Sequence, residues 1–382
     1  MENRNRVVIA GAGITGLTIA FRLKQKGIPF LLLEALPAPG GKIGTLEKNG
    51  FHLDLGPATC ARNQPLTELI SDLGISSKVI LPTRAFRKRY IDSKRKLHAI
   101  PPHPIHWLLT EILSFRSKLS IFKDLCVSPS LFQEDESVSN FVRRHFSEEV
   151  LQRLFDPIIN GIYAGSPDRL SILSVMPWLK KLEGEHGSII KGLWKNRKNL
   201  NLKREIISFR GGFKTLIEAM ATEIGESLLF NARVNEIKAD GESLKLSFSE
   251  SGELKEMAIQ QLILTLPAPD AGQVLCKIDS EIAETLNTIT YNPIWQIYCS
   301  LESQGFTGFD GFGFLIPSAE KMTLLGGAHN SGLFPGRAPQ GRELFTLFCK
   351  SNTEDEATIV RNVSSDFVSL FNLAVPPDTP EI

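Results

Sequence analysis

The hydrophobic pattern changes its period repeatedly within the first 34 residues. Residues 6–10 (RVVIA) form a short, largely β-branched run, which predicts a buried strand. The next segment, ITGLTIAFRLKQK, has apolar residues at helical spacing between Leu17 and Leu23, and Gly27 follows as a C-terminal cap. Residues 29–34 (PFLLLE) form a second apolar run. The pattern therefore predicts a strand, a helix and a strand, which is the order of a βαβ unit.

Three later stretches also have apolar and polar residues at a regular spacing. Residues 84–96 alternate around an Asp-Ser dipeptide, which predicts two short strands with an exposed tip. Residues 104–132 have apolar residues at helical spacing over a wide face, with Trp107 near the start. Such a helix commonly packs against its own domain, and the alternative is a helix that lies in a membrane interface. Residues 355–373 have a helical pattern.

Composition narrows the class of protein. The chain has 382 residues, of which 42% are apolar and 22% charged, as in soluble globular proteins with room for more than one domain. Its net charge of +1 argues against a nucleic-acid partner. The five cysteines are far apart and form no CxxC pair, so we expect no metal site, no disulfide framework and a reducing, cytoplasmic compartment. No apolar run approaches about 18 residues, so a spanning helix is not expected.

The turn between the first strand and the helix reads GAGITG (11–16). A secretion signal also combines basic residues with an apolar run, but this run is broken by glycines and is followed by LKQKG rather than a cleavage site. Gly11, Gly13 and Gly16 have the G-x-G-x-x-G spacing that permits a tight turn, backbone approach to a pyrophosphate and close helix–strand packing. Glu34 ends the second strand, where a carboxylate accepts hydrogen bonds from ribose hydroxyls.

A second small-residue turn follows soon after Glu34. Gly40, Gly41 and Lys42 lie where a simple NAD dehydrogenase continues into another helix. A second glycine pair with a cation can embrace the far side of a longer dinucleotide that carries a flavin. An ordinary polar loop is the alternative interpretation. The two turns together favour FAD over NAD.

Longer segments carry a resemblance. EALPAPGGKIGT (34–45) and GFHLDLGPA (50–58) resemble the amine-oxidase-like flavoprotein superfamily, and residues 209–220, 228–248 and 262–269 are similar to its later glycine-pair helix, strand pair and returning strand. The resemblance implies an FAD-binding fold. It implies FAD contacts from Gly11, Gly13, Ile14, Thr15, Gly16, Glu34, Ala35, Gly40, Gly41, Lys42, Gly56, Pro57 and Val234.

One segment indicates which members of this superfamily the sequence resembles most. Residues 155–192 contain the order D-P-x-x-x-G-x-Y-A-G-x-P-x-x-L-S and then L-E-x-x-x-G-S-I-I-x-G, which is similar to protoporphyrinogen and coproporphyrinogen oxidases. Without the resemblance the segment would be interpreted as a structural corner. Residues 87–101, 310–318 and 333–341 resemble further signatures of these enzymes. The resemblance implies FAD-dependent oxidation of a porphyrinogen in haem biosynthesis.

The same resemblance implies a substrate site. Arg89 matches the arginine that precedes an aromatic residue in the family pattern, and a planar guanidinium suits a propionate carboxylate. The alternative is a solvated hairpin, since residues 84–96 carry many cations. The bend and the apolar walls of the site would come from Ala164, Gly165, Leu315, Leu325 and Phe348, for which ordinary core packing is the alternative.

The implied reaction needs no side-chain catalyst. A porphyrinogen would lose its electrons in successive two-electron transfers to FAD, which oxygen or another acceptor would reoxidise. The histidines are scattered in unlike contexts, and Ala58 stands where some family members carry a polar residue. We therefore expect no catalytic residue on the protein. Family members also end with a glycine-rich element that wraps the flavin, and its absence from LAVPPDTPEI predicts a truncated sequence or a more open flavin site.

The expected fold is α/β, with a Rossmann-like FAD-binding domain interleaved with a mixed-sheet substrate domain and a helical insertion. Two alternative functions remain at this point, an amine oxidase or carotenoid desaturase and a non-catalytic protein that binds flavin or porphyrin. Peripheral contact of the insertion with the cytoplasmic membrane and a homodimer are further expectations. The predicted boundaries are 1–83 and 204–268 for the FAD domain, 84–96, 166–203 and 269–382 for the substrate domain, and 97–165 for the insertion.

Overall fold

The computed structural model divides the chain into two compact units, which are described separately. The first comprises Met1–Lys48, His52–Leu81 and Glu205–Tyr291, and the second comprises Asn49–Phe51, Pro82–Arg204 and Asn292–Ile382. The structure describes residues 6–101, 110–126, 135–196, 205–241, 243–304, 306, 309–350 and 355–378.

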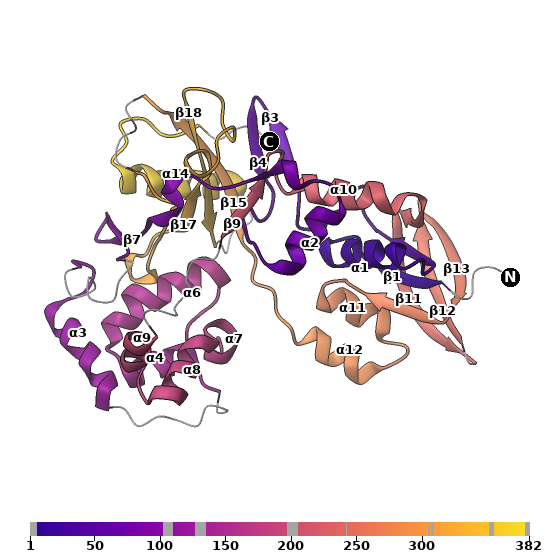
Figure 1. The fold of residues 1–382 in the computed structure, drawn as a ribbon, viewed down its shortest axis with the longest axis horizontal. Helices are drawn as coiled ribbons and strands as arrows, with labels where there is room; N and C mark the ends of the chain where they lie inside the picture. Colours follow the sequence, from indigo (N-terminus) through magenta and orange to yellow (C-terminus); the bar gives the residue numbers. More distant parts are fainter. Residues whose placement is uncertain are drawn as a thin grey trace. The chain divides into compact units, whose positions relative to one another are not determined.

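The first unit is built on a parallel sheet in the order β10-β2-β1-β14. Every residue of β1 (Val7–Ala10) and β2 (Phe30–Leu33) is buried, because alternate side chains face opposite sides of the sheet and both sides are covered. Ile9 and Leu32 pack under the helices α1 (Ile14–Gln25) and α10 (Lys214–Ile224), which lie side by side in Figure 1. The predicted βαβ unit and the α/β fold class are confirmed.

The other face of this sheet is covered by a second, antiparallel sheet. Val8 and Leu33 form one core with Leu246 and Phe248 of the three-stranded sheet β11-β12-β13. The remaining elements of the unit are β10 (Leu228–Leu229), β11 (Ala232–Asp240), β12 (Ser243–Glu250), β13 (Glu253–Ile259), β14 (Gln261–Leu264), α2 (Gln64–Asp72), α11 (Ala268–Leu275), α12 (Ser280–Asn287), η1 (Ser76–Lys78), η6 (Gly225–Ser227), and the short strands β3 (Thr45–Lys48), β4 (Phe51–Asp54), β5 (Cys60–Ala61), β6 (Val79–Ile80) and β9 (Ile206–Phe209).

The second unit contains a six-stranded mixed sheet in the order β15-β18-β17-β16-β7-β8. The amphipathic helix α14 (Glu356–Phe371) covers one face, where its Val363 and Phe367 pack on Phe345 and Leu347 of β18. Only β16 and β7 pair in parallel among its neighbouring strands. The strands are β7 (Arg89–Ser93), β8 (Lys96–Ala99), β15 (Trp295–Glu302), β16 (Gly313–Leu315), β17 (Leu324–His329) and β18 (Arg342–Cys349), with η2 (Arg84–Arg87), η7 (Ser318–Glu320) and α13 (Asn330–Leu333) between them.

The second unit also holds a bundle of short helices with its own core. Phe141, Val142, Ile159 and Ile172 are completely buried in it. Its elements are α3 (Phe115–Ser120), η4 (Ile121–Cys126), α4 (Val138–His145), α5 (Glu148–Val150), the π-helical turn η5 (Leu151–Phe155), α6 (Asp156–Tyr163), α7 (Ile172–Val175), α8 (Pro177–His186) and α9 (Ile189–Lys195).

Several boundaries differ from the sequence prediction. Residues 269–291 belong to the first unit, because Val274 of α11 is buried in the core beneath β11 and β12. The helical region extends beyond residue 165 to α9, since Ile172, Leu179 and Ile189 complete its core. Of the helix predicted over 104–132, residues 104–109 and 127–132 lie outside the described residues, and the described part forms α3 and η4.

The predicted hairpin also differs in detail. Asp92 and Ser93 are buried in β7 rather than forming its turn, and the turn is made by Lys94 and Arg95, whose φ angles are 56° and 62°. Residues 84–87 form the 3-10 turn η2 instead of a strand. A hairpin turn whose two central residues have positive φ matches the right-handed twist of the flanking strands. These positions usually hold glycine or asparagine, so lysine and arginine are unusual here.

Candidate functional site

The first glycine turn lies at the carboxyl end of β1 and begins α1. Gly11 has a φ of 98°, a conformation that favours glycine. A Cβ atom on Gly16 would lie 1.9 Å from the carbonyl oxygen of Gly11, so this residue must be glycine for the helix to pack on the turn. A Cβ atom on Gly13 would meet no atom within 4 Å, although Gly13 caps the helix with an ordinary φ of −68°. The fold itself therefore leaves free space above Gly13, where a ligand phosphate could approach the helix N-terminus.

Glu34 is held in place by two backbone groups. One carboxylate oxygen accepts a hydrogen bond from Ala12 N at 2.7 Å, and the other accepts one from Leu36 N at 2.9 Å. The residue is 7% exposed, so its carboxylate is presented at the end of β2 in one orientation. Each oxygen keeps a further lone pair for the hydroxyl groups of a ribose.

The second glycine turn lies directly against the first. Gly40 N donates to Ala12 O at 2.8 Å, and Gly13 and Gly40 form an isolated parallel bridge. Gly40 and Gly41 both have positive φ, at 117° and 58°. The atom nearest to a Cβ on Gly41 would be the Cα of Gly13, at 3.4 Å. The two turns therefore bring three glycine backbones together around one space.

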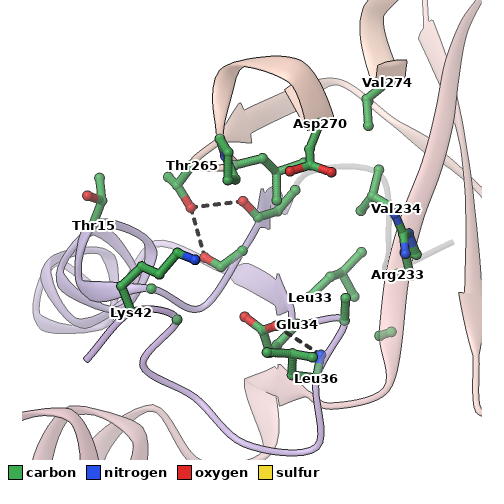
Figure 2. Close-up of a pocket in the computed structure, with 18 of the residues that line it drawn as sticks. Thr15, Leu33, Glu34, Leu36, Lys42, Arg233, Val234, Thr265, Asp270 and Val274 are labelled. Carbon is green, nitrogen blue, oxygen red and sulfur yellow. Dashed lines mark hydrogen bonds between the residues drawn. The ribbon is translucent and has the colours of Figure 1, made fainter. Parts of the chain in front are cut away.

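These turns line a cavity of about 620 Å³, shown in Figure 2. The volume falls within the range of about 300–1,000 Å³ that is typical of cofactor sites. The predicted cofactor residues that line it are Gly11, Gly13, Ile14, Thr15, Glu34, Ala35, Gly40, Gly41, Lys42 and Val234.

Three predicted cofactor residues do not line this cavity. Gly16 supports the turn from behind, as its contact with Gly11 shows. A Cβ on Gly56 would lie 2.1 Å from the carbonyl oxygen of Lys42, so Gly56 allows the chain to pack against the second turn. Pro57 is exposed. The structure therefore assigns Gly16 and Gly56 to supporting the two turns, and it leaves a role for Pro57 as a prediction.

The cavity also has a wall that sequence reasoning missed. Thr265, at the end of β14, donates its hydroxyl hydrogen to the carbonyl oxygens of Ala10 and Gly11, both at 2.8 Å, and so fastens β14 to the glycine turn. Asp270 lies near the start of α11, and Figure 2 places it across the cavity from Glu34. Arg233, beside Val234, adds a cation. The sequence signal in this region was the resemblance of residues 262–269 to the returning strand of the superfamily.

The donor set and free space fit the ADP half of FAD. The residues around Gly13 would hold the pyrophosphate, Glu34 would hold the ribose, and the β11 backbone at Val234 would face the adenine. This arrangement defines a dinucleotide-binding protein of the Rossmann-like class.

Comparison with known proteins narrows the class. Residues 14–381 match the model of the family described as flavin-containing amine oxidoreductases, and the chain belongs to this family. It is an FAD-dependent oxidoreductase. The chain is 32% identical to the mitochondrial protoporphyrinogen oxidase of Nicotiana tabacum, over 91% of this chain and 76% of that protein. It is 27% identical to the coproporphyrinogen III oxidase of Bacillus subtilis (strain 168), over 99% of this chain and 85% of that protein.

Solved structures agree on the fold. A crystal structure from Exiguobacterium sp. 255-15, assigned as a protoporphyrinogen oxidase, matches with a TM-score of 0.85 at 22% identity and covers 99% of this chain and 85% of that one. A redesigned putrescine oxidase matches with a TM-score of 0.69 at 14% identity, over 99% of this chain and 84% of that one. At these identities the likeness concerns the fold.

The predicted substrate residues of the sheet lie opposite α14. Phe345, Leu347 and Cys349 pack beneath α14, so the alternation of β18 places Phe348 on the other face. The same alternation places Leu315 opposite the α14-facing Phe314. Gly326 pairs with both Leu315 and Phe348, so these two side chains occupy one row of the sheet with a glycine between them.

Helix α6 packs on this row. A Cβ on Gly161 would lie 2.4 Å from Leu315 Cδ2 and 3.7 Å from the carbonyl oxygen of Leu325. Leu325, which is 8% exposed, lies at a bulge of β17. The structure thus brings three predicted apolar residues, Leu315, Leu325 and Phe348, to one region beside α6.

The bend at the end of α6 is tightly held. Ala164 caps the helix in a left-handed conformation with φ 49°, and its carbonyl oxygen accepts a hydrogen bond from Asn292 Nδ2 at 3.0 Å. A Cβ on Gly165 would lie 2.6 Å from Leu170 Cδ1. Gly165 is therefore explained by packing within the helical region, and its backbone contact with a substrate stays a prediction.

Arg89 occupies an aromatic sandwich. Its Cζ lies 5.1 Å from the ring centroid of Phe86 and 5.2 Å from that of Phe312. Desolvation lowers the pKa of its guanidinium, which nevertheless keeps its charge at neutral pH. No carboxylate among the described residues pairs with it. The rings hold the planar cation in place while its hydrogen-bond donors remain available.

Proposed function

We propose that this FAD-dependent oxidoreductase oxidises a porphyrinogen to the porphyrin in haem biosynthesis. The observation that carries the proposal is Arg89, a guanidinium held between two rings with no counter-ion in the described part of the chain. It lies in the same unit as Leu315, Leu325 and Phe348. A porphyrinogen combines a broad apolar ring system with propionate carboxylates, which matches such a surface. The protoporphyrinogen and coproporphyrinogen oxidases among the relatives support the same substrate class.

FAD would supply the redox chemistry by accepting electrons in pairs, and oxygen or another acceptor would take them onward. The residues of this chain bind and orient: the two glycine turns and Glu34 position the dinucleotide, and Arg89 fixes the propionate edge of the substrate. The direct test uses FAD-loaded protein and follows porphyrin fluorescence and hydrogen peroxide. Turnover faster than in air alone supports the proposal, and reduction of the flavin by polyamines instead would overturn it.

Replacing Arg89 by methionine is expected to raise the KM for the porphyrinogen about tenfold or more, with a smaller effect on kcat. Methionine keeps apolar bulk between Phe86 and Phe312 but removes a charge-assisted hydrogen bond of about 1.5–3 kcal/mol. Arg89→Lys should recover part of the loss. The control is Lys94→Gln, which removes an exposed cation of the same hairpin that has no acidic partner among the residues the structure describes. If Arg89→Met and the wild type had the same KM, Arg89 would not contribute to substrate binding.

We further propose that α3 and η4 contact a membrane surface. Phe115 is 75% exposed, Leu119 53% and Phe122 50%, so an apolar face of this segment has no cover among the described residues. Lys118 lies on the same segment and favours anionic lipid. Among the described residues no helix is long and apolar enough to cross a bilayer. The homodimer expected from the sequence stays a prediction.

Phe115→Asp is expected to abolish sedimentation with vesicles of phosphatidylglycerol while leaving thermal stability unchanged, because the side chain is largely exposed. The control is Leu254→Asp, which changes a residue that is 69% exposed on β13. Loss of binding in both variants, or in neither, would contradict the membrane contact.

A further inference from the structure

The cations of residues 84–96 fall into two groups. The lysines at 88 and 96 and the arginine at 95 each face an acidic side chain, whereas Lys94 and the arginines at 84, 87 and 89 face none among the described residues. The pairs are Lys88 with Asp310, Arg95 with Asp366 at 3.9 Å, and Lys96 with Glu111 at 3.8 Å.

The turn that carries Arg84 and Arg87 is anchored firmly. Thr83 N donates to Leu333 O at 2.9 Å, and its hydroxyl group donates to Gly332 O at 2.6 Å. At the other end of η2, Phe86 packs edge-on against Phe312 with ring centroids 6.2 Å apart. This is the ring pair that holds Arg89. Arg84 and Arg87 are therefore displayed from a braced turn rather than from a free loop. Arg89, the first residue of β7, stacks on a ring of the same turn.

The 3-10 geometry of η2 places Arg84 and Arg87 on the same face. Side chains three residues apart eclipse each other in a 3-10 helix, about 6 Å apart along its axis. Both residues are exposed. Two parallel guanidinium groups suit two separate carboxylates, because each offers a planar fork to paired oxygens.

The strand alternation separates Lys88 from Arg89. Lys88 and Tyr90 both contact Asp310, so they share a side of the chain and Arg89 faces the other side. The side with Lys88 is neutralised within the protein. The arginines are not, and like charges within six residues repel one another unless a ligand supplies negative charge.

We propose that Arg84 and Arg87 form, together with Arg89, a three-arginine carboxylate clamp that selects a porphyrinogen bearing a carboxylate on each of its four rings over one bearing two. The inference rests on the proposed function and assigns it a substrate class. Arg89 serves a propionate that both substrates carry. Arg84 and Arg87 bind carboxylates that are present only on the substrate with four of them. They therefore determine specificity rather than activity.

The test compares coproporphyrinogen III, with four carboxylates, and protoporphyrinogen IX, with two, on FAD-loaded wild type and Arg84→Gln/Arg87→Gln. We expect the variant to raise the KM for the four-carboxylate substrate about tenfold, to leave that for the two-carboxylate substrate within about twofold, and to keep kcat for both. Arg84→Lys/Arg87→Lys should restore much of the loss. The charge-matched control is Lys94→Gln/Lys321→Gln, which changes two exposed lysines of the same unit.

Two further outcomes separate this inference from the proposed function. Equal KM changes for both substrates, or the same selective change in the lysine control, would overturn the clamp while porphyrinogen oxidation stands. If the wild type oxidises neither substrate, the proposed function fails, and the affinity of the FAD-loaded protein for coproporphyrin and protoporphyrin, measured by fluorescence, then decides the clamp. A tenfold loss of coproporphyrin binding in the arginine variant alone would support it, and equal binding would overturn it.

Discussion

Replacing Gly13 by valine is expected to produce a folded protein that no longer binds FAD. A Cβ on Gly13 would meet no protein atom within 4 Å, and its φ of −68° suits any residue, so the unliganded fold has room for a side chain there. The same space is bounded by Gly40 and Gly41, where the pyrophosphate would lie. We expect the dissociation constant for FAD to rise by more than about 1,000-fold, or about 4 kcal/mol, because the side chain occupies the phosphate position.

Gly16→Val is the informative comparison. Its Cβ would lie 1.9 Å from the carbonyl oxygen of Gly11, so this variant should fail to fold stably whether or not FAD is present. The measurements are the flavin absorbance that stays with protein after gel filtration and the thermal unfolding of cofactor-free protein by circular dichroism. If Gly13→Val retained flavin, the first glycine turn would not be part of the cofactor site. If the cofactor-free variant failed to fold, Gly13 would be needed for packing instead.

The contrast between these glycines shows what the sequence could and could not establish. The spacing of three glycines between a β-branched strand and an amphipathic helix was sufficient to predict the βαβ unit and the cradle. It could not separate Gly13, which leaves space for a ligand, from Gly16, which packs against the chain. Thr265 was missed because a single threonine 254 residues away in the sequence carries no local signal that it will hydrogen-bond to the turn.

The cationic hairpin illustrates a second limit. Asp-Ser is a common turn dipeptide, so the predicted turn was placed there, but the structure buries both residues and bends at Lys94 and Arg95. Charge counts also could not show which cations are neutralised. Asp310 and Asp366 lie more than 200 residues away in the sequence, and only the folded structure of the second unit, with Asp310 before β16 and Asp366 on α14, brings them to Lys88 and Arg95. The distinction on which the carboxylate clamp depends is therefore a property of the fold.

The helical region hides a buried charge network that periodicity alone would interpret as solvated helix faces. Lys180 Nζ lies 2.8 Å from Glu136 Oε1 and 3.2 Å from Glu183 Oε2, and Lys180 and Glu183 are both fully buried. His145 Nε2 lies 3.4 Å from Glu183 Oε1, and His145 also contacts Asp124. The network joins α4, α8 and η4, so the charges connect helices that are distant in the sequence.

Replacing Asp124 by alanine is expected to destabilise the second unit by about 3–5 kcal/mol, because it leaves buried donors without an acceptor. Asp124 is completely buried in η4, and its carboxylate lies 2.5 Å from His145 Nδ1. It also accepts hydrogen bonds from Ser188 Oγ at 2.5 Å and from Ile190 N at 2.8 Å, at the start of α9. The control is Glu185→Ala, which breaks an exposed pair with Lys181 on α8 and should cost less than about 1 kcal/mol.

The Asp124 carboxylate should also make the free energy of unfolding of the second unit fall at acid pH. Burial alone would raise the pKa of Asp124, but the hydrogen bonds from His145, Ser188 and the α9 backbone outweigh it and hold the pKa below its usual value. A lowered pKa in the folded state adds stability above the unfolded value of about 3.9, and that stability is lost as the pH falls through the folded pKa. Urea unfolding followed by the fluorescence of Trp178 and Trp194, on α8 and α9, should therefore show a steeper loss of stability below about pH 4 in the wild type than in Asp124→Ala. If the free energy of unfolding fell equally steeply below about pH 4 in both proteins, Asp124 would not be ionised in the folded state.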